Sequence, residues 1–152
     1  MMIISKMNPD DIEQVAGIEK DTFSVPWSKK AFDDTLELKN VIFLVAKENE
    51  KVLGYCGVYI ALDEGEITNV AVAQSFQNRG IAGRLLQELK MQAMKYGVKN
   101  CYLEVRKSNQ AAIHLYQKNG FEVKGVRKRF YEKPIEDAYI MAAEYCNSEK
   151  DI

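Results

Sequence analysis

The sequence has little of what a metal site, a disulfide framework or a membrane protein needs. It contains one histidine, His114, and three cysteines, Cys56, Cys101 and Cys146, which lie far apart and form no CxxC motif. This usage argues against a histidine-rich metal site and a secreted disulfide scaffold, and it predicts reduced thiols in a cytoplasmic protein. No long apolar run is present, so we expect no metal and no membrane span.

An excess of charge of either sign is also missing. Lys and Arg number 21 against 22 Asp and Glu, which gives a formal net charge of -1. Without a broad basic field, binding to nucleic acid or to an anionic membrane is not expected. The 152 residues are 47% hydrophobic, which suits one compact domain. We expect that domain over residues 1–147, followed by a short polar tail over residues 148–152, and a monomer or weak dimer.

Caps and turns divide the chain into alternating strands and helices. Strands are predicted near residues 1–6, 41–46, 52–60, 66–73, 101–105, 121–129 and 138–145. Helices are predicted after Asn8, after Ser28, after Gly80 and after Ser108 or Asn109. We expect the last of these helices to bury Ala112, Leu115 and Tyr116. The order β-α-α-β-β-β-α-β-α-β-β indicates an α/β fold with a mixed sheet.

The segment QNRGIAGR, residues 77–84, connects a predicted strand to a long predicted helix. Free amides at a helix start attract anions, and small residues let a phosphate approach the backbone. Arg79 and Arg84 could add charge. No Gly-Lys-Ser/Thr follows and the Gly-x-Gly-x-x-Gly spacing is absent, so this is neither a Walker A loop nor a dinucleotide fingerprint. The residues alone favour a phosphate loop and an ordinary flexible loop equally.

Two motifs resemble a known family. Gln77-x-x-Gly80-x-Ala82 is similar to motif A of the GNAT acyltransferase superfamily, although Ala82 replaces the commoner second glycine. The segment YLEVRKSNQAAIHLYQKNGF, residues 102–121, resembles the LEVR-x-SN-x-x-A-x-x-LY-x-x-x-GF block of RimI-type N-alpha-acetyltransferases. The tail from 127 to 141 and residues 26–28 extend this resemblance over most of the chain. Phe130 departs from it, since these proteins usually have a tyrosine there.

The resemblance implies an enzyme that transfers acetyl from acetyl-CoA to the N-terminal amine of a protein, with a small-subunit ribosomal protein as the suggested acceptor. It implies direct attack in a ternary complex, with no covalent enzyme intermediate. It also implies that acetyl-CoA is bound by Val70, Ala71, Val72, Asn78, Arg79, Gly80, Ile81, Ala82, Gly83 and Asn109. From sequence alone, Asn109 could equally serve as a helix cap.

The resemblance implies Glu104 as general base and Tyr116 as the acid that protonates the leaving thiolate. From its strand position alone, Glu104 is more simply a solvent-facing glutamate, and Tyr116 a core aromatic residue. Glu66 is a rival base or an electrostatic anchor for the amine, and alternation would place it on one face with Thr68, Val70 and Val72.

Further residues are expected near the acceptor. Trp27 and Tyr131 are expected at the peptide entrance, whereas for Phe23 a place in the core is favoured. Glu136 and Asp137 could attract a cationic amine or could lie in a solvated turn.

Three other functions stay open at this stage. The first is a GNAT enzyme that acetylates lysine side chains or a small amine. The second is an RNA-binding module, since Gly80-Ile81-Ala82-Gly83 formally matches the GxxG loop of KH domains. The third is a protein that binds acyl-CoA without turnover, which the presence of both Glu104 and Tyr116 argues against.

Overall fold

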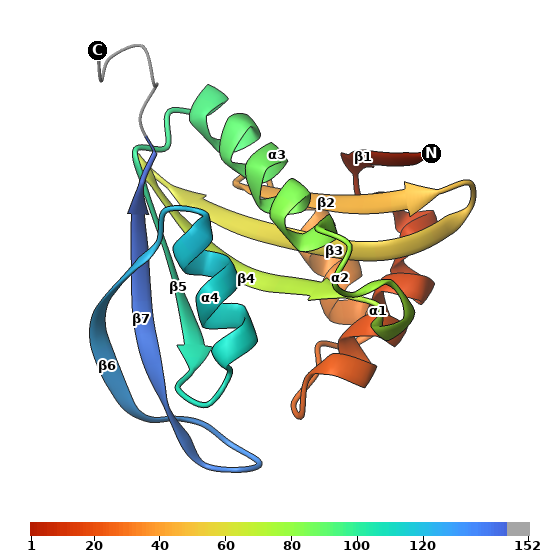
Figure 1. The fold of residues 1–152 in the computed structure, drawn as a ribbon. Helices are drawn as coiled ribbons and strands as arrows, with labels where there is room; N and C mark the ends of the chain where they lie inside the picture. Colours follow the sequence, from red (N-terminus) through yellow and green to blue (C-terminus); the bar gives the residue numbers. More distant parts are fainter. Residues whose placement is uncertain (146–152) are drawn as a thin grey trace.

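The computed structural model describes residues 1–145, which form one seven-stranded sheet covered by helices on both faces (Figure 1). The strands are β1 (Met2–Lys6), β2 (Val41–Glu48), β3 (Lys51–Ala61), β4 (Glu64–Val72), β5 (Asn100–Arg106), β6 (Glu122–Tyr131) and β7 (Glu136–Glu144). The helices are α1 (Ile12–Thr22), α2 (Lys29–Leu36), α3 (Ile81–Lys95) and α4 (Gln110–Lys118), with 3-10 turns η1 (Pro9–Asp11) and η2 (Gln74–Phe76). This order confirms the predicted α/β fold.

The sheet is mixed, as expected. Its strand order is β1-β2-β3-β4-β5-β7-β6, and every neighbouring pair is antiparallel except β4 and β5. The parallel pair is short, because only Glu64, Gly65 and Glu66 pair with β5 before the two strands diverge (Figure 1). A gap therefore opens in the middle of the sheet, at the ends of β4 and β5 that carry residues 67–72 and 103–106.

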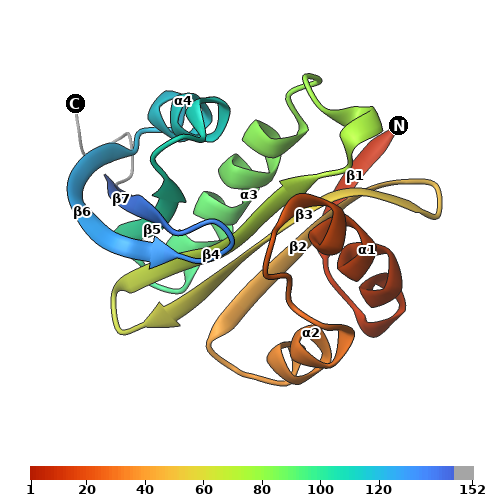
Figure 2. The same cartoon turned by 90° about the horizontal axis from the view of Figure 1, so that it is seen from below.

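Two hydrophobic clusters lie on opposite faces of the sheet. α1 and α2 cover one face, while α3 and α4 cover the other (Figure 2). The α3 face buries Leu85, Leu89 and Leu103 completely, and the α1 face does the same with Val15 and Phe32. Both faces of the central strands are thus fixed by packing, so the position of the gap between β4 and β5 is fixed as well.

The predicted caps agree with the structure. Asn8 accepts a hydrogen bond from the amide of Asp10, Ser28 from Ala31, and Asn109 from Ala112. Gly97 and Gly120 end α3 and α4 in the left-handed conformation, at φ 87° and 89°. These local signals depend on the backbone geometry of a few consecutive residues, which explains why the sequence alone reveals them.

Several details differ from expectation. In α4, Ile113 and Tyr116 are buried, whereas Ala112 and Leu115 are only partly covered. The face of the helix that packs on the sheet is therefore centred on Ile113 and Tyr116 and not on the predicted stripe. Strand ends also move by a few residues, since ladder pairing extends β2 to Glu48 and starts β4 at Glu64. The predicted domain boundary at 147, the tail 148–152 and Cys146 lie outside the described residues.

β4 carries a bulge that strict alternation does not predict. Gly57 pairs with Asn69 and Val58 with Ile67, so Thr68 is an extra residue without a partner on β3. The extra residue reverses the alternation, because one unpaired residue shifts every later side chain to the opposite face. Glu66 therefore does not share a face with Val70 and Val72. That prediction was wrong.

Candidate active site

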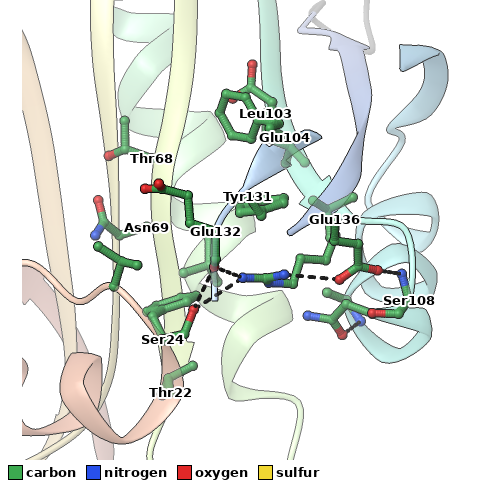
Figure 3. Close-up of a pocket in the computed structure, with 18 of the residues that line it drawn as sticks. Thr22, Ser24, Thr68, Asn69, Leu103, Glu104, Ser108, Tyr131, Glu132 and Glu136 are labelled. Carbon is green, nitrogen blue, oxygen red and sulfur yellow. Dashed lines mark hydrogen bonds and ion pairs between the residues drawn. The ribbon is translucent and has the colours of Figure 1, made fainter. Parts of the chain in front are cut away.

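A cleft of about 610 Å³ lies where β4 and β5 separate (Figure 3). Its walls come from four parts of the chain: the turn after α1, the bulged part of β4, the end of β5 with the start of α4, and the β6–β7 hairpin. Polar residues that line it are Glu19, Thr22, Ser24, Thr68, Asn69, Glu104, Arg106, Ser108, Asn109, Glu132, Lys133 and Glu136. The cleft therefore brings together segments from most of the sequence.

Glu104 points into this cleft from β5. Its side chain is 11% exposed, and its Oε2 lies 3.2 Å from the Arg127 Nε. Burial raises the pKa of the Glu104 carboxyl, and the negative charge of Glu66 raises it further, whereas Arg127 lowers it. A carboxyl with a raised pKa is a better proton acceptor when ionised than an exposed one, which is the property that a general base requires.

Tyr116 reaches the same cleft from α4. The residue is 9% exposed, and its ring packs against Phe121 with centroids 5.9 Å apart. Burial raises the pKa of the Tyr116 phenol, and nearby Tyr131 raises it further. The phenol therefore stays protonated at neutral pH and can act as a proton donor. The structure thus brings Glu104 and Tyr116 to one cleft from two successive elements.

Glu66 lies outside the set of residues that line the cleft. It pairs with Tyr59 on β3 and with Tyr102 on β5, before the two central strands diverge. Its effect on the site is electrostatic, because its charge contributes to the raised pKa of Glu104. Of the two carboxylates, only Glu104 therefore lines the cleft.

On one side of the cleft, β4 continues through residues 70–72 toward the loop 77–83, and we call these two segments the phosphate-loop side. Of their residues only Val70 lines the cleft itself. Gly80 precedes α3 in the left-handed conformation, at φ 76°, and no side chain caps this helix. The amide of Arg84 donates to the Gly80 carbonyl, so the amides of residues 81–83 precede the first helical hydrogen bond. Asn78 also has a positive φ, 65°. Uncapped amides with the positive end of the helix dipole fit a pyrophosphate.

Other predicted residues of this side lie as follows. The guanidinium of Arg79 lies 5.3 Å from the ring centroid of Phe76, on the 3-10 turn that precedes the loop. Val70 and Asn109 line the cleft itself. Asn109 is a helix cap, since its Oδ1 accepts from the amide of Ala112, and this leaves its Nδ2 as the group that could face a ligand.

The opposite end, which we call the hairpin side, consists of residues 23–28, Arg106 and residues 130–136. Arg106 joins its parts: the guanidinium donates to the carbonyl oxygens of Glu132 and Pro134 at 2.8 and 2.9 Å, and to the Ser24 Oγ at 3.2 Å. It also pairs with Glu136 at 3.1 Å. One side chain thus ties the turn after α1 to the β6–β7 hairpin (Figure 3).

Aromatic residues complete the hairpin side. The Arg106 guanidinium lies 4.6 Å from the ring centroid of Tyr131, whose pKa burial raises to about 12. Trp27 lines the cleft and packs on Phe32, with ring centroids 5.1 Å apart. Phe23 also lines the cleft and is 37% exposed, so its predicted place in the core was wrong: the chain turns outward after α1. Phe130 lines the cleft as well.

Glu136 and Asp137 are engaged within the protein. Glu136 accepts a hydrogen bond from the Ser108 amide at 2.7 Å and forms an ion pair with Arg106. Its pKa is lowered, chiefly by hydrogen bonding with the Ser108 side chain and then by Arg106 and the Ser108 amide. Asp137 accepts from the Arg129 amide at 2.9 Å, which lowers its pKa too. Both carboxylates thus have partners within the protein, and the attraction of an amine to them stays a prediction.

Sequence reasoning missed a buried polar network beside the cleft. The Glu19 carboxylate, on α1, accepts from the Trp27 amide at 3.0 Å, from the Asn69 Nδ2 at 3.2 Å and from the Tyr55 hydroxyl. Glu19 is 2% exposed and Asn69 3%. The available signal was a glutamate on the apolar face of a helix, which indicates a buried charge with partners elsewhere in the chain.

Comparison with known proteins agrees with this geometry. The sequence model of the Acetyltransferase (GNAT) family matches residues 12–121. The [ribosomal protein bS18]-alanine N-acetyltransferase of Escherichia coli K12 is 34% identical over 144 residues, covering 93% of this chain and 97% of that protein. The Haemophilus influenzae protein of the same name is 34% identical over 145 residues, with 93% and 98% coverage.

A solved structure gives the same result. The crystal structure of the ribosomal-protein-S18-alanine N-acetyltransferase from Escherichia coli superimposes with a TM-score of 0.89 at 31% identity, covering 100% of this chain and 99% of that one. The fold is that of the GNAT acetyltransferases, and the protein is an acetyl-CoA-dependent N-acetyltransferase. The chain belongs to the GNAT acetyltransferase family. The KH-like RNA-binding alternative is therefore wrong, since Gly80 is the N-cap of α3 in a GNAT fold and the residues up to Gly83 form the first turn of that helix.

Two further findings concern metals and membranes. In residues 1–145, no group of three or more His, Cys, Asp or Glu side chains is arranged to hold a metal ion. Over the same residues, no helix combines the length and the apolar character needed to cross a bilayer.

Proposed function

We propose that this protein acetylates the α-amine of a ribosomal protein N-terminus, with an alanine of a bS18-like protein as the first candidate. Relatives that match nearly their whole length carry that activity in their names. The observation that carries the proposal is the placement of Glu104 and Tyr116 in one cleft between the separated strands β4 and β5. With such an acceptor, the enzyme would work in the cytoplasm, where ribosomes are made.

The charges of the cleft suit an amine acceptor. Glu19 is engaged by three donors and Glu136 by Arg106, whereas Glu104, paired with Arg127 through its Oε2, and Glu132 also line the cleft as carboxylates. A terminal ammonium has a pKa of about 7.7–8.0, so it enters mostly as a cation at neutral pH. It would be attracted by these carboxylates before it loses a proton.

The proposed reaction begins with proton removal. Glu104 takes one proton from the ammonium, directly or through a water molecule, and the neutral nitrogen attacks the thioester carbonyl. A new C–N bond forms and the carbonyl oxygen becomes negative. Backbone amides of residues 70–72, on the β4 wall, are the proposed donors to that oxygen, because β4 is not paired with β5 beyond Glu66.

The intermediate then collapses with loss of the thiolate. The C–S bond breaks, and Tyr116 donates its phenolic proton to the sulfur, which leaves as CoA thiol. The nitrogen gives up its remaining extra proton to solvent, Glu104 releases to solvent the proton that it took in the first step, and the Tyr116 phenolate is reprotonated from solvent. We propose that the phosphate-loop side holds the pyrophosphate through the amides of residues 80–83, while the hairpin side holds the peptide against Trp27 and Tyr131.

A peptide assay tests this function. The wild-type protein would be incubated with acetyl-CoA and peptides that begin with different residues, each offered also with a blocked N-terminus and an internal lysine. Release of CoA gives the rate, and fragmentation by mass spectrometry locates the acetyl group. We expect acetyl on the free α-amine only, with the highest rate for a peptide that begins with alanine.

Two outcomes would contradict the proposal differently. Acetyl found on lysine in the blocked peptides, with none on free termini, would keep the family and the co-substrate but change the acceptor. Tight binding of acetyl-CoA with no transfer to any amine would instead indicate a protein that binds acyl-CoA without turnover.

A further inference from the structure

The mechanism proposed above leaves one buried polar atom without a role. Among residues 1–145, the Oδ1 of Asn69 is the one buried side-chain nitrogen or oxygen without a hydrogen-bond partner. Asn69 is 3% exposed and lines the cleft. A buried acceptor left unpaired destabilises the protein, so the native protein would gain from a donor at this place.

The orientation of the Asn69 carboxamide is fixed by its neighbours. Its Nδ2 donates to the Oε1 of Glu19 at 3.2 Å. That carboxylate can only accept hydrogen bonds, and it already receives them from the Trp27 amide and the Tyr55 hydroxyl. A flipped carboxamide would bring two oxygens together, so the nitrogen must face Glu19 and the Oδ1 must face away from it.

The surroundings of Asn69 indicate what the missing donor is. It follows the bulge at Thr68 and precedes residues 70–72, the proposed donors to the thioester oxygen. Figure 3 shows Thr68 and Asn69 on the β4 wall, and the side chain of Glu132 reaching toward that wall from the hairpin. Glu104 lines the same cleft. A group that enters here meets several oxygen acceptors, which suits a donor with several N–H bonds.

We propose that the Oδ1 of Asn69 accepts a hydrogen bond from the terminal amine of the acceptor. This inference rests on the proposed function. The ammonium brings three N–H bonds, and Glu104 removes one proton. Of the two N–H bonds that remain, one donates to Asn69, which turns the lone pair of the nitrogen toward the thioester carbonyl. The Glu19 carboxylate fixes this orientation by accepting a hydrogen bond from the Asn69 Nδ2, and it also accepts one from the amide of Trp27 in the turn after α1.

The test compares two peptides and two variants. One peptide has the terminal amine, and the other has hydrogen in its place and is otherwise identical. Binding of each to the CoA-saturated enzyme is measured by calorimetry, for wild type, Asn69→Ala and Tyr55→Phe. Tyr55→Phe is the matched control, because Tyr55 donates to the same Glu19 carboxylate but does not line the cleft.

We expect Asn69→Ala to weaken the amine peptide roughly tenfold, as for loss of a hydrogen bond to a charged donor, and to change the des-amino peptide by less than about twofold. Tyr55→Phe should change the affinities for the two peptides by the same factor. Equal losses for both peptides in Asn69→Ala would overturn the proposal, because they would indicate that Asn69 only supports the fold. No loss for either peptide would also overturn it, since a water molecule would then satisfy the Oδ1.

A measurement on the wild-type protein covers the case in which Asn69→Ala does not fold. The side-chain amide resonance of Asn69, assigned by nitrogen-15 NMR, should shift on addition of the amine peptide and not of the des-amino peptide. Equal shifts would contradict the inference. The wild-type acetylation assay keeps the two proposals apart: absence of α-amine acetylation defeats the proposed function, whereas acetylation without discrimination at Asn69 defeats only this inference.

Discussion

The two sides of the cleft are built in different ways. The phosphate-loop side is a matter of backbone: a left-handed Gly80, an uncapped helix start, and a strand that leaves its partner after Glu66. The hairpin side depends on side chains from distant segments, above all Arg106, which contacts Ser24 and the carbonyls of Glu132 and Pro134. The difference suits a family whose co-substrate is constant and whose acceptors vary, because side chains can change without altering the backbone of the other side.

The groups between the two sides should affect turnover above all. Glu104→Gln is expected to lower kcat about 100-fold or more, the usual range for loss of a general base, with the KM for acetyl-CoA nearly unchanged. Steady-state kinetics with each substrate varied in turn provide the measurement. A Gln variant as fast as wild type would exclude Glu104 as the base.

The raised pKa of Glu104 also predicts how kcat should change with pH. Burial and Glu66 raise the pKa of Glu104, and the base works only when ionised, so kcat should fall as the pH is lowered through a pKa above the ordinary 4.5. In Glu66→Gln, one of the groups that raise the pKa is removed, and the fall should move to lower pH with kcat at high pH retained. Loss of activity at all pH values in Glu66→Gln would make Glu66 the base instead.

Tyr116→Phe should also act on kcat, with a decrease of roughly 10- to 100-fold, because only the phenolic proton is removed. The ring would keep its packing on Phe121, so the melting temperature should stay within a few degrees of wild type. An acetyl donor thioester with a more acidic leaving thiol needs less protonation of the sulfur and should reduce the defect in kcat. An unchanged defect with such a thioester would argue against the role of Tyr116 as an acid.

Arg106→Ala is expected to raise the peptide KM about tenfold, because four hydrogen bonds are lost together, three from β5 to the β6–β7 hairpin and one to Ser24 in the turn after α1. The KM for acetyl-CoA should not change. The peptide KM of Arg106→Lys should lie between those of the wild type and Arg106→Ala, since an ammonium cannot reproduce the planar fork of a guanidinium. Equal changes in both KM values would show that the two sides of the cleft are not separable.

Gly80→Ala should have the smallest kinetic effect of these variants, and that effect should concern the phosphate-loop side. At φ 76° an alanine is strained by about 1–2 kcal/mol, while no atom lies within 4 Å of the added Cβ, so the cost falls on the backbone of the loop. The KM for acetyl-CoA should rise several-fold and the peptide KM should stay constant. Gly17→Ala, inside α1 with equally open surroundings, is the matched control and should stabilise the protein slightly.

The sequence predicted features that depend on local backbone geometry better than features that depend on contacts between distant segments. The caps at Asn8, Ser28 and Asn109 and the helix ends at Gly97 and Gly120 agree with the structure, because each depends on a few consecutive residues. The 102–121 motif indicated the family and the placement of Glu104 and Tyr116 on a strand and the helix that follows it. The roles of these two residues stay predictions.

Tertiary structure decided what strand alternation and composition could not. The bulge at Thr68 leaves no local sequence signal, yet it turns Asn69 toward Glu19 and separates Glu66 from the face of Val70. The contacts that shape the cleft join residues 50, 82 and 108 positions apart, namely Asn69 with Glu19, Ser24 with Arg106, and Ser24 with Glu132. Local backbone geometry is encoded by neighbours in the chain, whereas a buried polar partner is chosen only when packing brings distant elements together.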